Sequence, residues 1–422
     1  MLIPLIVSAL LMGQTFMDPE SEQMDPETAQ KEHFPRFTFG QGGTLSIRAY
    51  GALKGYTFPQ TDKDSQERGW HSNAAFSIGK VSFRYKLGED FTARMDAELG
   101  TDRLEPQELW FQYRALPSLF LRAGRFKSPF GLAQVEGYLE RPFPDAPLIS
   151  GNAKDFYDTG FMFIFRSSLA TLYGAAVTGS RDVAPSSNEE PDAVGRLLVH
   201  PFKKGSTGTL GSLLRDFHVG VSGSTGRGPS RNGFRGRTPG DFTYTPPATI
   251  RGDHRRFGVE AQWKTPWFYV RGEYQHDEMA RQGLASFDYE PYVVKGWYVE
   301  TGIPVPGLSR RKNGLRGLEF MGRFEQISHG DGEKSTDISG IQTDIAPLTE
   351  IDVTALTLGL AWHVSANIRL YFMWQGMWFS DPRQAPDFVT PDDWTSSTAP
   401  VGWKPTTHGP VHHFFLWTTF RI

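Results

Sequence analysis

The sequence contains no cysteine among its 422 residues, and it has no long apolar run. Without cysteine, a disulfide framework and a cysteine-ligated zinc site are both excluded. No window approaches the roughly 18 consecutive apolar residues that a membrane-spanning helix needs. Hydrophobic residues make up only 39% of the chain, whereas aromatic residues reach 14% and glycine numbers 45. This balance favours many strands joined by glycine-rich turns over a bundle of helices.

Motifs that carry catalysis or bind cofactors are also missing. The sequence has no phosphate-binding loop, no dinucleotide glycine motif, no Gly-x-Ser-x-Gly elbow and no His-Glu-x-x-His pair. His412 and His413 are adjacent, so in a strand they point to opposite faces and cannot bind one metal ion together. We therefore expect no enzyme activity, no cofactor, no metal site and no nucleic-acid partner.

The first 35 residues differ from the rest of the chain. Residues 2–12 form a short apolar segment of the size found in signal peptides, too short to span a membrane. We expect residues 1–16 to be a signal peptide; a misassigned start codon or a buried strand are the alternatives. Residues 17–35 repeat Met-Asp-Pro-Glu twice and are mostly acidic, which is typical of a flexible leader. Residues 36–422 are then expected to form a single body.

From Gly43 onwards apolar and polar residues alternate, which is the pattern of strands with two different faces. Tight turns such as Leu87-Gly-Glu-Asp90 alternate with long polar connections. The pattern predicts five strands up to residue 127, followed by strands near 158–167, 170–179, 192–201, 215–225, 255–264, 267–276, 290–301, 316–327, 351–363, 367–379 and 410–422. About sixteen strands with short turns at one end and long loops at the other are typical of an outer-membrane barrel.

The direction of the alternation separates a membrane barrel from a soluble sheet protein. In the last predicted strand Phe414 and Leu416 share one face, and Leu370 and Phe372 do so in the strand before. Arg369 lies on the opposite face of that strand. Bulky apolar residues on one face and charges on the other fit lipid outside and water inside. The sequence therefore predicts an all-β fold, a transmembrane antiparallel barrel spanning residues 36–422.

One connection in this pattern stands out by its length. It follows the predicted fifth strand, contains about thirty residues rich in proline, glycine and charge, and carries Arg125 and Lys127 at its entry. Structureless connections this long are usually functional. We interpret it as a third loop folded into the lumen, pinned by Phe126 and Phe130, where it narrows a pore. The alternative for Lys127 is a structural pair with an acid such as Glu136.

Basic residues gather on the polar faces of the early strands and in the third loop. Rings of lysine and arginine select anions in a narrow, partly desolvated pore. The candidate pore residues are Arg48, Arg84, Lys86, Arg94, Arg114, Arg122, Arg125, Lys127 and Arg141. Asp96 and Glu98 oppose them on the same strands. The alternative is that these charges only keep a water-filled lumen solvated.

A second basic group lies between residues 226 and 256. Arginine matches phosphate geometry with paired donors, so an exposed arginine-rich loop could gather anions at the mouth of a channel. The candidate vestibule residues are Arg227, Arg231, Arg235 and Arg237. Binding of lipopolysaccharide phosphates and an ordinary solvated loop are the alternatives.

The segment from Leu121 to Leu132 reads Leu-Arg-Ala-Gly-Arg-Phe-Lys-Ser-Pro-Phe-Gly-Leu. It is similar to the Gly-x-Phe-Lys-x-Pro-Phe-Gly signature of the phosphate-selective porin O/P family of Gram-negative outer membranes. Glu140-Arg-Pro-Phe143 resembles the Glu-Arg motif of that family, and the similarity covers roughly residues 40–422. The resemblance implies a sixteen-stranded trimeric barrel with an inward third loop and a preference for anions such as phosphate.

This resemblance also implies the partners: outer-membrane lipid and lipopolysaccharide, small anions, and two further copies of the chain in a homotrimer. A different class of function remains open at this point. The barrel could have a plugged lumen and serve mainly as a surface, structural or binding protein of the outer membrane.

Overall fold

The computed structural model describes the chain from residue 36 to residue 421, with gaps. The described residues are 36–40, 42–61, 68–99, 104–137, 141–152, 157–179, 191–202, 213–214, 216–234, 236–240, 242–245, 248–265, 267–282, 288–305, 317–331, 350–365, 367–381, 385–386 and 410–421. The expected signal peptide (1–16) and the whole of the leader (17–35) lie outside them. No helix in the described part of the chain is long and apolar enough to cross a membrane.

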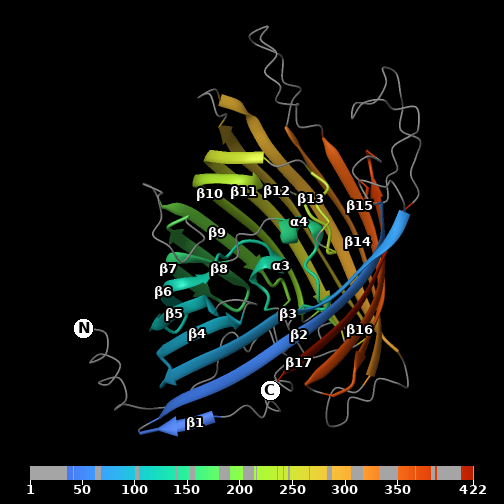
Figure 1. Cartoon of the computed structure of the whole chain (residues 1–422). Coiled ribbons are helices and arrows are strands. Elements are labelled where there is room, and N and C mark those ends of the chain that lie inside the picture. Colours follow the sequence, from blue (N-terminus) through green and yellow to red (C-terminus); the bar gives the residue numbers. More distant parts are fainter. Residues whose placement is uncertain are drawn as a thin grey trace.

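The chain forms a closed antiparallel barrel of sixteen strands, β2 to β17 (Figure 1). The strands are β1 (Arg36–Phe39), β2 (Gly43–Thr61), β3 (Arg68–Leu87), β4 (Phe91–Leu99), β5 (Leu104–Leu116), β6 (Leu119–Lys127), β7 (Tyr157–Arg166), β8 (Ala170–Val177), β9 (Asp192–Val199), β10 (Asp216–Phe234), β11 (Ala248–Lys264), β12 (Tyr269–Gln282), β13 (Asp288–Pro304), β14 (Gly317–Asp331), β15 (Ile351–His363), β16 (Ile368–Phe379) and β17 (Val411–Arg421). Each pairs with its neighbour in sequence, and β17 pairs with β2 to close the barrel. The short strand β1 pairs with the first residues of β2.

Period-two alternation located nearly every strand, and the predicted all-β barrel of about sixteen strands is confirmed. The long third connection does join the fifth and sixth barrel strands, β6 and β7, and it contains two short helices, α3 (Leu132–Val135) and α4 (Leu148–Asn152). The largest errors are at strand ends. Strands β10 and β11 run on to Phe234 and from Ala248, through a region that the sequence predicted as an exposed loop. The backbone hydrogen bonds between paired strands form whatever the side chains are. Strands β10 and β11 therefore continue through a sequence that is rich in glycine and polar residues.

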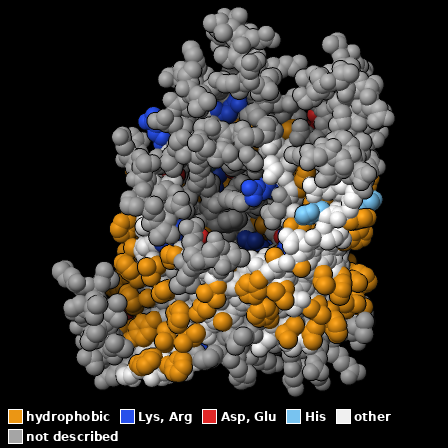
Figure 2. Space-filling view, viewed as in Figure 1, with side chains coloured by type: hydrophobic (Ala, Val, Ile, Leu, Met, Phe, Trp, Pro, Cys, Tyr) orange, Lys and Arg blue, Asp and Glu red, His pale blue; other side chains and the backbone are white. Residues whose placement is uncertain are grey.

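The two faces of the strands are chemically distinct. In β16, Phe372 is 52% exposed whereas Tyr371 and Met373 beside it are buried, so alternate residues face outward and inward. Phe414 and Leu416 of β17 are exposed in the same way. Figure 2 shows the outward apolar side chains gathered in a belt across the lower part of the visible face. Such a belt is the surface that a barrel presents to lipid. The predicted outward rows of both strands are confirmed.

This facing gives a test at Phe372. Replacing Phe372 by Arg places a charge in the apolar belt, and near the bilayer midplane such a change costs about 2–4 kcal/mol of folding stability. Replacing Phe372 by Leu keeps an apolar side chain and should cost far less. Folding titrations into lipid vesicles measure both variants against the unchanged protein. Equal stabilities for the Arg and Leu variants would contradict the assigned facing.

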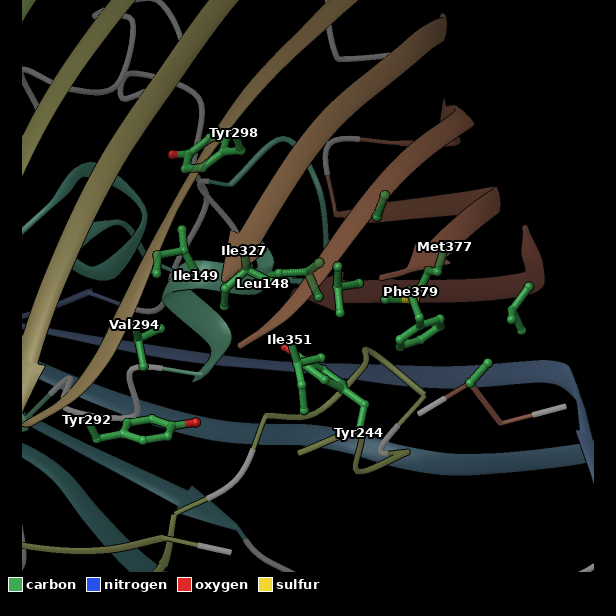
Figure 3. Packing of buried hydrophobic residues seen from close by; sticks show 14 of the residues in the cluster. Leu148, Ile149, Tyr244, Tyr292, Val294, Tyr298, Ile327, Ile351, Met377 and Phe379 are labelled. Atoms are coloured by element: carbon green, nitrogen blue, oxygen red, sulfur yellow. The ribbon is translucent and has the colours of Figure 1, made fainter. Parts of the chain in front are cut away.

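The buried apolar side chains lie on the inward rows and on the segments that cover them. The largest cluster joins Leu148 and Ile149 of α4 to the inward side chains of β13 to β16, such as Val294, Ile327 and Met377 (Figure 3). A barrel of this kind has its core inside, where a connecting segment meets the wall. Function therefore depends on which inward side chains of the barrel wall the interior segments leave uncovered.

Candidate functional site

The predicted basic residues of the early strands converge on one inner wall, formed by β2 to β6. Strand register places Arg48 directly opposite Ser82 and Arg84 directly opposite Arg94. Directly opposed residues of paired antiparallel strands share a face. The same registers align Lys86 with Thr92, Thr92 with Gln112, and Gln112 with Arg122. Arg48, Arg84, Lys86, Arg94, Arg114 and Arg122 are all half-buried. We call these six residues the basic wall.

Acidic side chains are interleaved with the basic wall. Arg94 Nη2 lies 2.8 Å from Asp96 Oδ2, and Arg94 Nε lies 3.2 Å from Glu108 Oε2. Lys80 Nζ also contacts Asp96, at 3.2 Å, and Asp96 is fully buried. Arg114 pairs with Glu89 at 3.1 Å. Asp96 was expected from the sequence, but Glu89 and Glu108 were not.

Arg122 is held in a fixed orientation. Its guanidinium carbon lies 4.0 Å from the centre of the Trp110 ring, and Nη2 donates to Gln112 Oε1 at 2.9 Å. Trp110 is 3% exposed and donates to Glu108 Oε2 at 2.9 Å. A guanidinium stacked on an indole keeps its charge and loses rotational freedom. The basic wall therefore includes at least one preorganised cation.

Arg125 does not lie where the sequence placed it. Register pairs it with Leu109 on β5 and Thr159 on β7, and Leu109 is 58% exposed on the outward row. The neighbouring Phe126 is fully buried. Arg125 follows Gly124, whose φ of 122° is open to glycine but not to residues with a side chain. The strand alternation thus assigns Arg125 to the outer row, not to the basic wall.

Lys127 contacts the third loop. Its Nζ donates to the backbone carbonyl of Glu136 and lies 5.9 Å from the centre of the Tyr157 ring. The Glu136 carboxylate in turn accepts from Arg271 on β12. The structural alternative for Lys127, a link to Glu136, is therefore present through the backbone carbonyl.

Helix α3 is anchored to β12 through its backbone. The N–H groups of Leu132 and Ala133 donate to the two carboxylate oxygens of Glu273, at 3.0 and 3.1 Å. Gly131, just before the helix, has a φ of 69°, and a Cβ there would lie 2.1 Å from Glu273 Oε1. Only glycine fits this approach. The Pro-Phe-Gly sequence at the loop entry thus serves contact between α3 and the inward row of β12.

A second anchor lies at α4. The Leu148 N–H donates to Glu325 Oε2 at 2.6 Å, and Arg323 Nη1 donates to the Asp145 carbonyl at 2.9 Å. Arg323 also lies 4.7 Å from the centre of the Phe143 ring. Phe143 is 1% exposed, so its ring is covered on both sides. The described parts of this segment, 131–137 and 141–150, therefore contact the inward rows of β12 to β14, and Asp145 also pairs with Lys54 of β2 at 3.2 Å.

The wall beneath the third loop carries a ladder of two arginines and three carboxylates. Arg271 bonds both Glu136 and Glu300, and Arg323 bonds Glu325 at 3.2 Å and approaches Glu300 at 3.7 Å. All five side chains are at least nine-tenths buried. Buried charges persist only when paired and hydrogen-bonded. In this ladder each arginine contacts two carboxylates, and the Arg271–Glu136 pair holds the loop.

Sequence reasoning missed the ladder, yet a signal was present. Arg271 and Glu273, Arg323 and Glu325, and also Arg94 and Asp96, stand two residues apart on strands. That spacing puts both charges of each pair on one face. Charge pairs of opposite sign at this spacing, on strands whose other face is apolar, mark an ionised inner wall.

The surroundings of the loop residues Glu136 and Arg141 lower the pKa values of both side chains. Burial alone would raise the pKa of Glu136, but the nearby Arg271, Lys264 and Arg141 charges hold it below its ordinary value of 4.5. Burial lowers the pKa of Arg141, and Glu136 partly offsets that effect. Arg141 thus lies beside the ladder in the third loop, where it faces both Glu136 and Arg271.

The lowered pKa of Glu136 gives a pH prediction. A carboxylate with a depressed folded-state pKa stabilises the fold above its unfolded pKa and stops doing so as pH falls through the folded value. Replacing Glu136 by Gln should therefore destabilise the protein at neutral pH, and the difference should vanish as pH drops below 4.5. Thermal unfolding in detergent measures it. A difference that fades above pH 5 would show that Glu136 is not held by Arg271.

The described residues of the predicted vestibule lie in the β10–β11 ladder and just beyond it. Arg227 lies in β10 on the outward row of Val219 and Val221. Arg231 pairs with Ile250 within the β10–β11 ladder, and Arg237 is exposed and bridged to Thr243. The side chain of Arg231 and the whole of Arg235 lie outside the described residues. Arg227 thus lies on the outward row of β10, because the strands continue through this region.

Comparison with known proteins agrees with this geometry. The family model described as phosphate-selective porin O and P matches residues 76–377. The chain belongs to this porin family. Among curated proteins no sequence matches it.

Solved structures show the same fold at low sequence identity. The porin resembles the outer membrane channel DcaP of Acinetobacter baumannii, with a TM-score of 0.55, 10% identity, and coverage of 92% of this chain and 99% of that one. It also resembles the trimer form of OmpT, an outer membrane protein of Vibrio cholerae, with a TM-score of 0.53, 12% identity, and coverage of 90% and 99%. The porin is thus an outer-membrane channel protein by family and fold.

Proposed function

We propose that this porin is an anion-preferring diffusion channel. The observation that carries the proposal is the unequal charge of its two inner walls. The basic wall of β2 to β6 holds six half-buried cations, with Asp96, Glu108 and Glu89 interleaved among them. On the wall of β12 to β14 the arginines Arg271 and Arg323 are matched by acids and covered by the third loop. The field in any remaining passage then comes mainly from the basic wall.

The third loop supports this role by position. Its anchors at Glu273 and Glu325 hold the described residues 131–137 and 141–150 against the inward rows of β12 to β14. We infer that the loop narrows the lumen and leaves the basic wall as the opposite side of the constriction. In a narrow, partly desolvated passage the effective permittivity falls, so each wall charge acts more strongly on a passing ion than it would in bulk water.

Phosphate is one of the permeating anions that we infer on chemical grounds. Arg84 and Arg94 stand directly opposite each other across β3 and β4. A divalent oxyanion between two guanidinium groups in that arrangement would accept paired hydrogen bonds from both. The family name points to the same solute. Other small anions satisfy the same chemistry with fewer bonds.

The same proposal covers assembly and location. The similar OmpT structure is a trimer form, and we infer a homotrimer for this porin in the outer membrane of a Gram-negative bacterium. Arg227 and Arg255 lie exposed on the outward rows of β10 and β11, near Val221 and Phe257 of the apolar belt. Cations at that boundary suit lipopolysaccharide phosphates. We infer a channel and not an enzyme.

A plugged barrel is the second candidate, and one observation favours it. Residues of α4 and of the β10–β11 connection pack with inward side chains into one apolar cluster inside the barrel (Figure 3). Single-channel recording in planar bilayers separates the two functions. A channel gives discrete current steps in potassium chloride, and phosphate added to the bath reduces the chloride current by competition. A purified, folded protein that produces no steps would support the plug.

A further inference from the structure

The strands β6 to β9 form a low part of the barrel, which we call the low wall. Strands β8 and β9 contain eight residues each and are the shortest barrel strands that the structure describes, whereas β10 and β11 contain 19 and 17 (Figure 1). Eight residues at about 3.3 Å each, tilted by roughly 40°, span a height of about 20 Å, whereas the apolar band of an outer-membrane barrel is about 25 Å tall. Irregular chain does not face lipid at hydrocarbon depth, so we expect protein to cover the space above these two strands.

A hollow of about 500 Å³ lies on the outward face of the low wall. It is lined mainly by Leu121, Phe161, Phe163, Gly174 and Ala176. Small residues continue beyond it in one outward row, because the register places Gly174 opposite Gly195 and Gly195 opposite Gly223. We call this row on β8, β9 and β10 the glycine floor. Between membrane helices, small residues let two surfaces approach closely, and the same packing reason applies to the outward face of a sheet.

Large apolar side chains stand beside the floor, on β5 to β7. Phe161 is 73% exposed, the highest fraction among the large apolar side chains in the described part of the chain. We call the following side chains the ridge: Leu109, Phe111, Tyr113, Leu121, Phe161 and Phe163. Together they expose roughly 600 Å². A stable interface buries about 800 Å² per partner, so ridge and floor together supply the area that one needs.

The positions of ridge and floor around the barrel favour a three-fold ring. The ridge is centred on β6 and the floor on β9, three strands further on. Sixteen strands share one turn of the barrel, so three strands correspond to about 70° around its axis. In a closed ring each subunit meets its two neighbours in directions about 60° apart for three copies and about 90° apart for four. The ridge of one copy can therefore meet the floor of the next, and the ring closes after three.

We propose that this face is the interface between copies of the chain, with the ridge of one copy packed into the hollow and the glycine floor of the next. The proposal rests on the homotrimer proposed above and deepens it, since it assigns the surface that holds the copies together. Lipid chains are as apolar as the ridge, so the drive for association comes from the fit between bulky ridge and flat floor. Each copy then covers the low wall of its neighbour.

Gly195→Trp tests the floor directly. A Cβ at Gly195 would lie 3.8 Å from the Tyr173 carbonyl oxygen, so the barrel itself accepts a side chain there. An outward tryptophan suits lipid but fills the space that the ridge of another copy needs. Overpacking a fitted contact weakens it by roughly 5- to 150-fold. We therefore expect the assembly to dissociate at a protein concentration at least about tenfold higher than the unchanged protein, as measured by light scattering of a dilution series in mild detergent.

Gly322→Trp is the matched control. Gly322 lies on the outward row of β14, between the exposed Phe320 and Phe324, and a Cβ there would also lie 3.8 Å from its nearest neighbours. Strand β14 is eight strands from β6, on the opposite side of the barrel. This variant should assemble like the unchanged protein.

Phe161→Ala tests the ridge without adding bulk. Truncating an aromatic anchor at the centre of an interface weakens association by about tenfold or more. Phe320→Ala removes an equally large side chain, 56% exposed, from the far side of the barrel and should leave the assembly unchanged. Resistance of each variant to heat shows that its barrel is folded.

Gly195→Trp and Phe161→Ala proteins that stay assembled like the unchanged protein would overturn this interface, because the face would then be covered by lipid. Equal losses in the Gly322→Trp and Phe320→Ala proteins would overturn it too, since any change on the outward face would then have the same effect. A monomeric unchanged protein would contradict the homotrimer itself. A channel without anion preference would contradict the proposed selectivity, and the masses would still decide the interface.

Discussion

Replacing Arg84 by Glu shifts the reversal potential of the channel toward cations in a salt gradient. The basic wall loses one positive charge and gains one negative charge, at a site where Arg94 stands directly opposite. Electrostatic focusing in a narrow passage changes local ion concentrations by roughly tenfold or more, so the permeability ratio should change by a similar factor. The variant should also fold well, because an opposite-charge pair replaces a like-charge pair across the two strands.

Arg227→Glu is the matched control for this experiment. It makes the same change of charge on the outward row of β10, away from the lumen. Its reversal potential should equal that of the unchanged protein. If Arg84→Glu leaves the potential unchanged while the barrel keeps its resistance to heat, Arg84 does not line the conducting path.

The second large effect is expected at Arg271. This side chain is 1% exposed and bonds Glu136 of the third loop and Glu300 of β13. Replacing Arg271 by Met leaves both carboxylates without their main partner, and breaking a buried pair in this way costs about 3–5 kcal/mol. We expect a lower unfolding temperature and a third loop released from its anchor at Glu136. Single-channel recording should then show a larger and noisier conductance.

Arg271→Lys separates charge from geometry. Lysine supplies a point charge but not the fork of donors that reaches two carboxylates, so its effects should lie between those of arginine and methionine. An Arg271→Met protein as stable as the unchanged one, with the same conductance, would show that the ladder does not hold the loop.

Much of the fold could be predicted because period-two alternation in a barrel indicates both where the strands lie and which face each side chain occupies. In β16 and β17 the apolar row is bulky and the opposite row is mixed, so Phe372, Phe414 and Leu416 were assigned outward correctly. The residues of the basic wall could be predicted for the same reason. Arg84 and Arg94 occupy the polar face of neighbouring strands joined by a tight turn at Gly88, whose φ is 58°. Local pattern and short connections fix such registers.

The interior contacts could not be predicted, because they join residues far apart in the sequence. Glu273 bonds Leu132 across 141 positions, and Lys54 reaches Pro239 across 185. No local pattern encodes such pairs. The prediction for the β10–β11 region failed for another reason. Its arginines and glycines are typical of a loop, whereas backbone hydrogen bonds continue the pairing of both strands past them. Arg125 failed because the sequence placed it at the entry of the loop, whereas β6 continues to Lys127 and its regular alternation assigns Arg125 to the outward row.

The central claim is that the basic wall sets the charge preference of an open channel. A reversal-potential measurement on the unmodified protein, in a planar bilayer with a tenfold gradient of potassium chloride, tests it most directly. The account predicts a potential whose sign and size correspond to chloride crossing faster than potassium. A potential of the opposite sign, or one near zero, would contradict it.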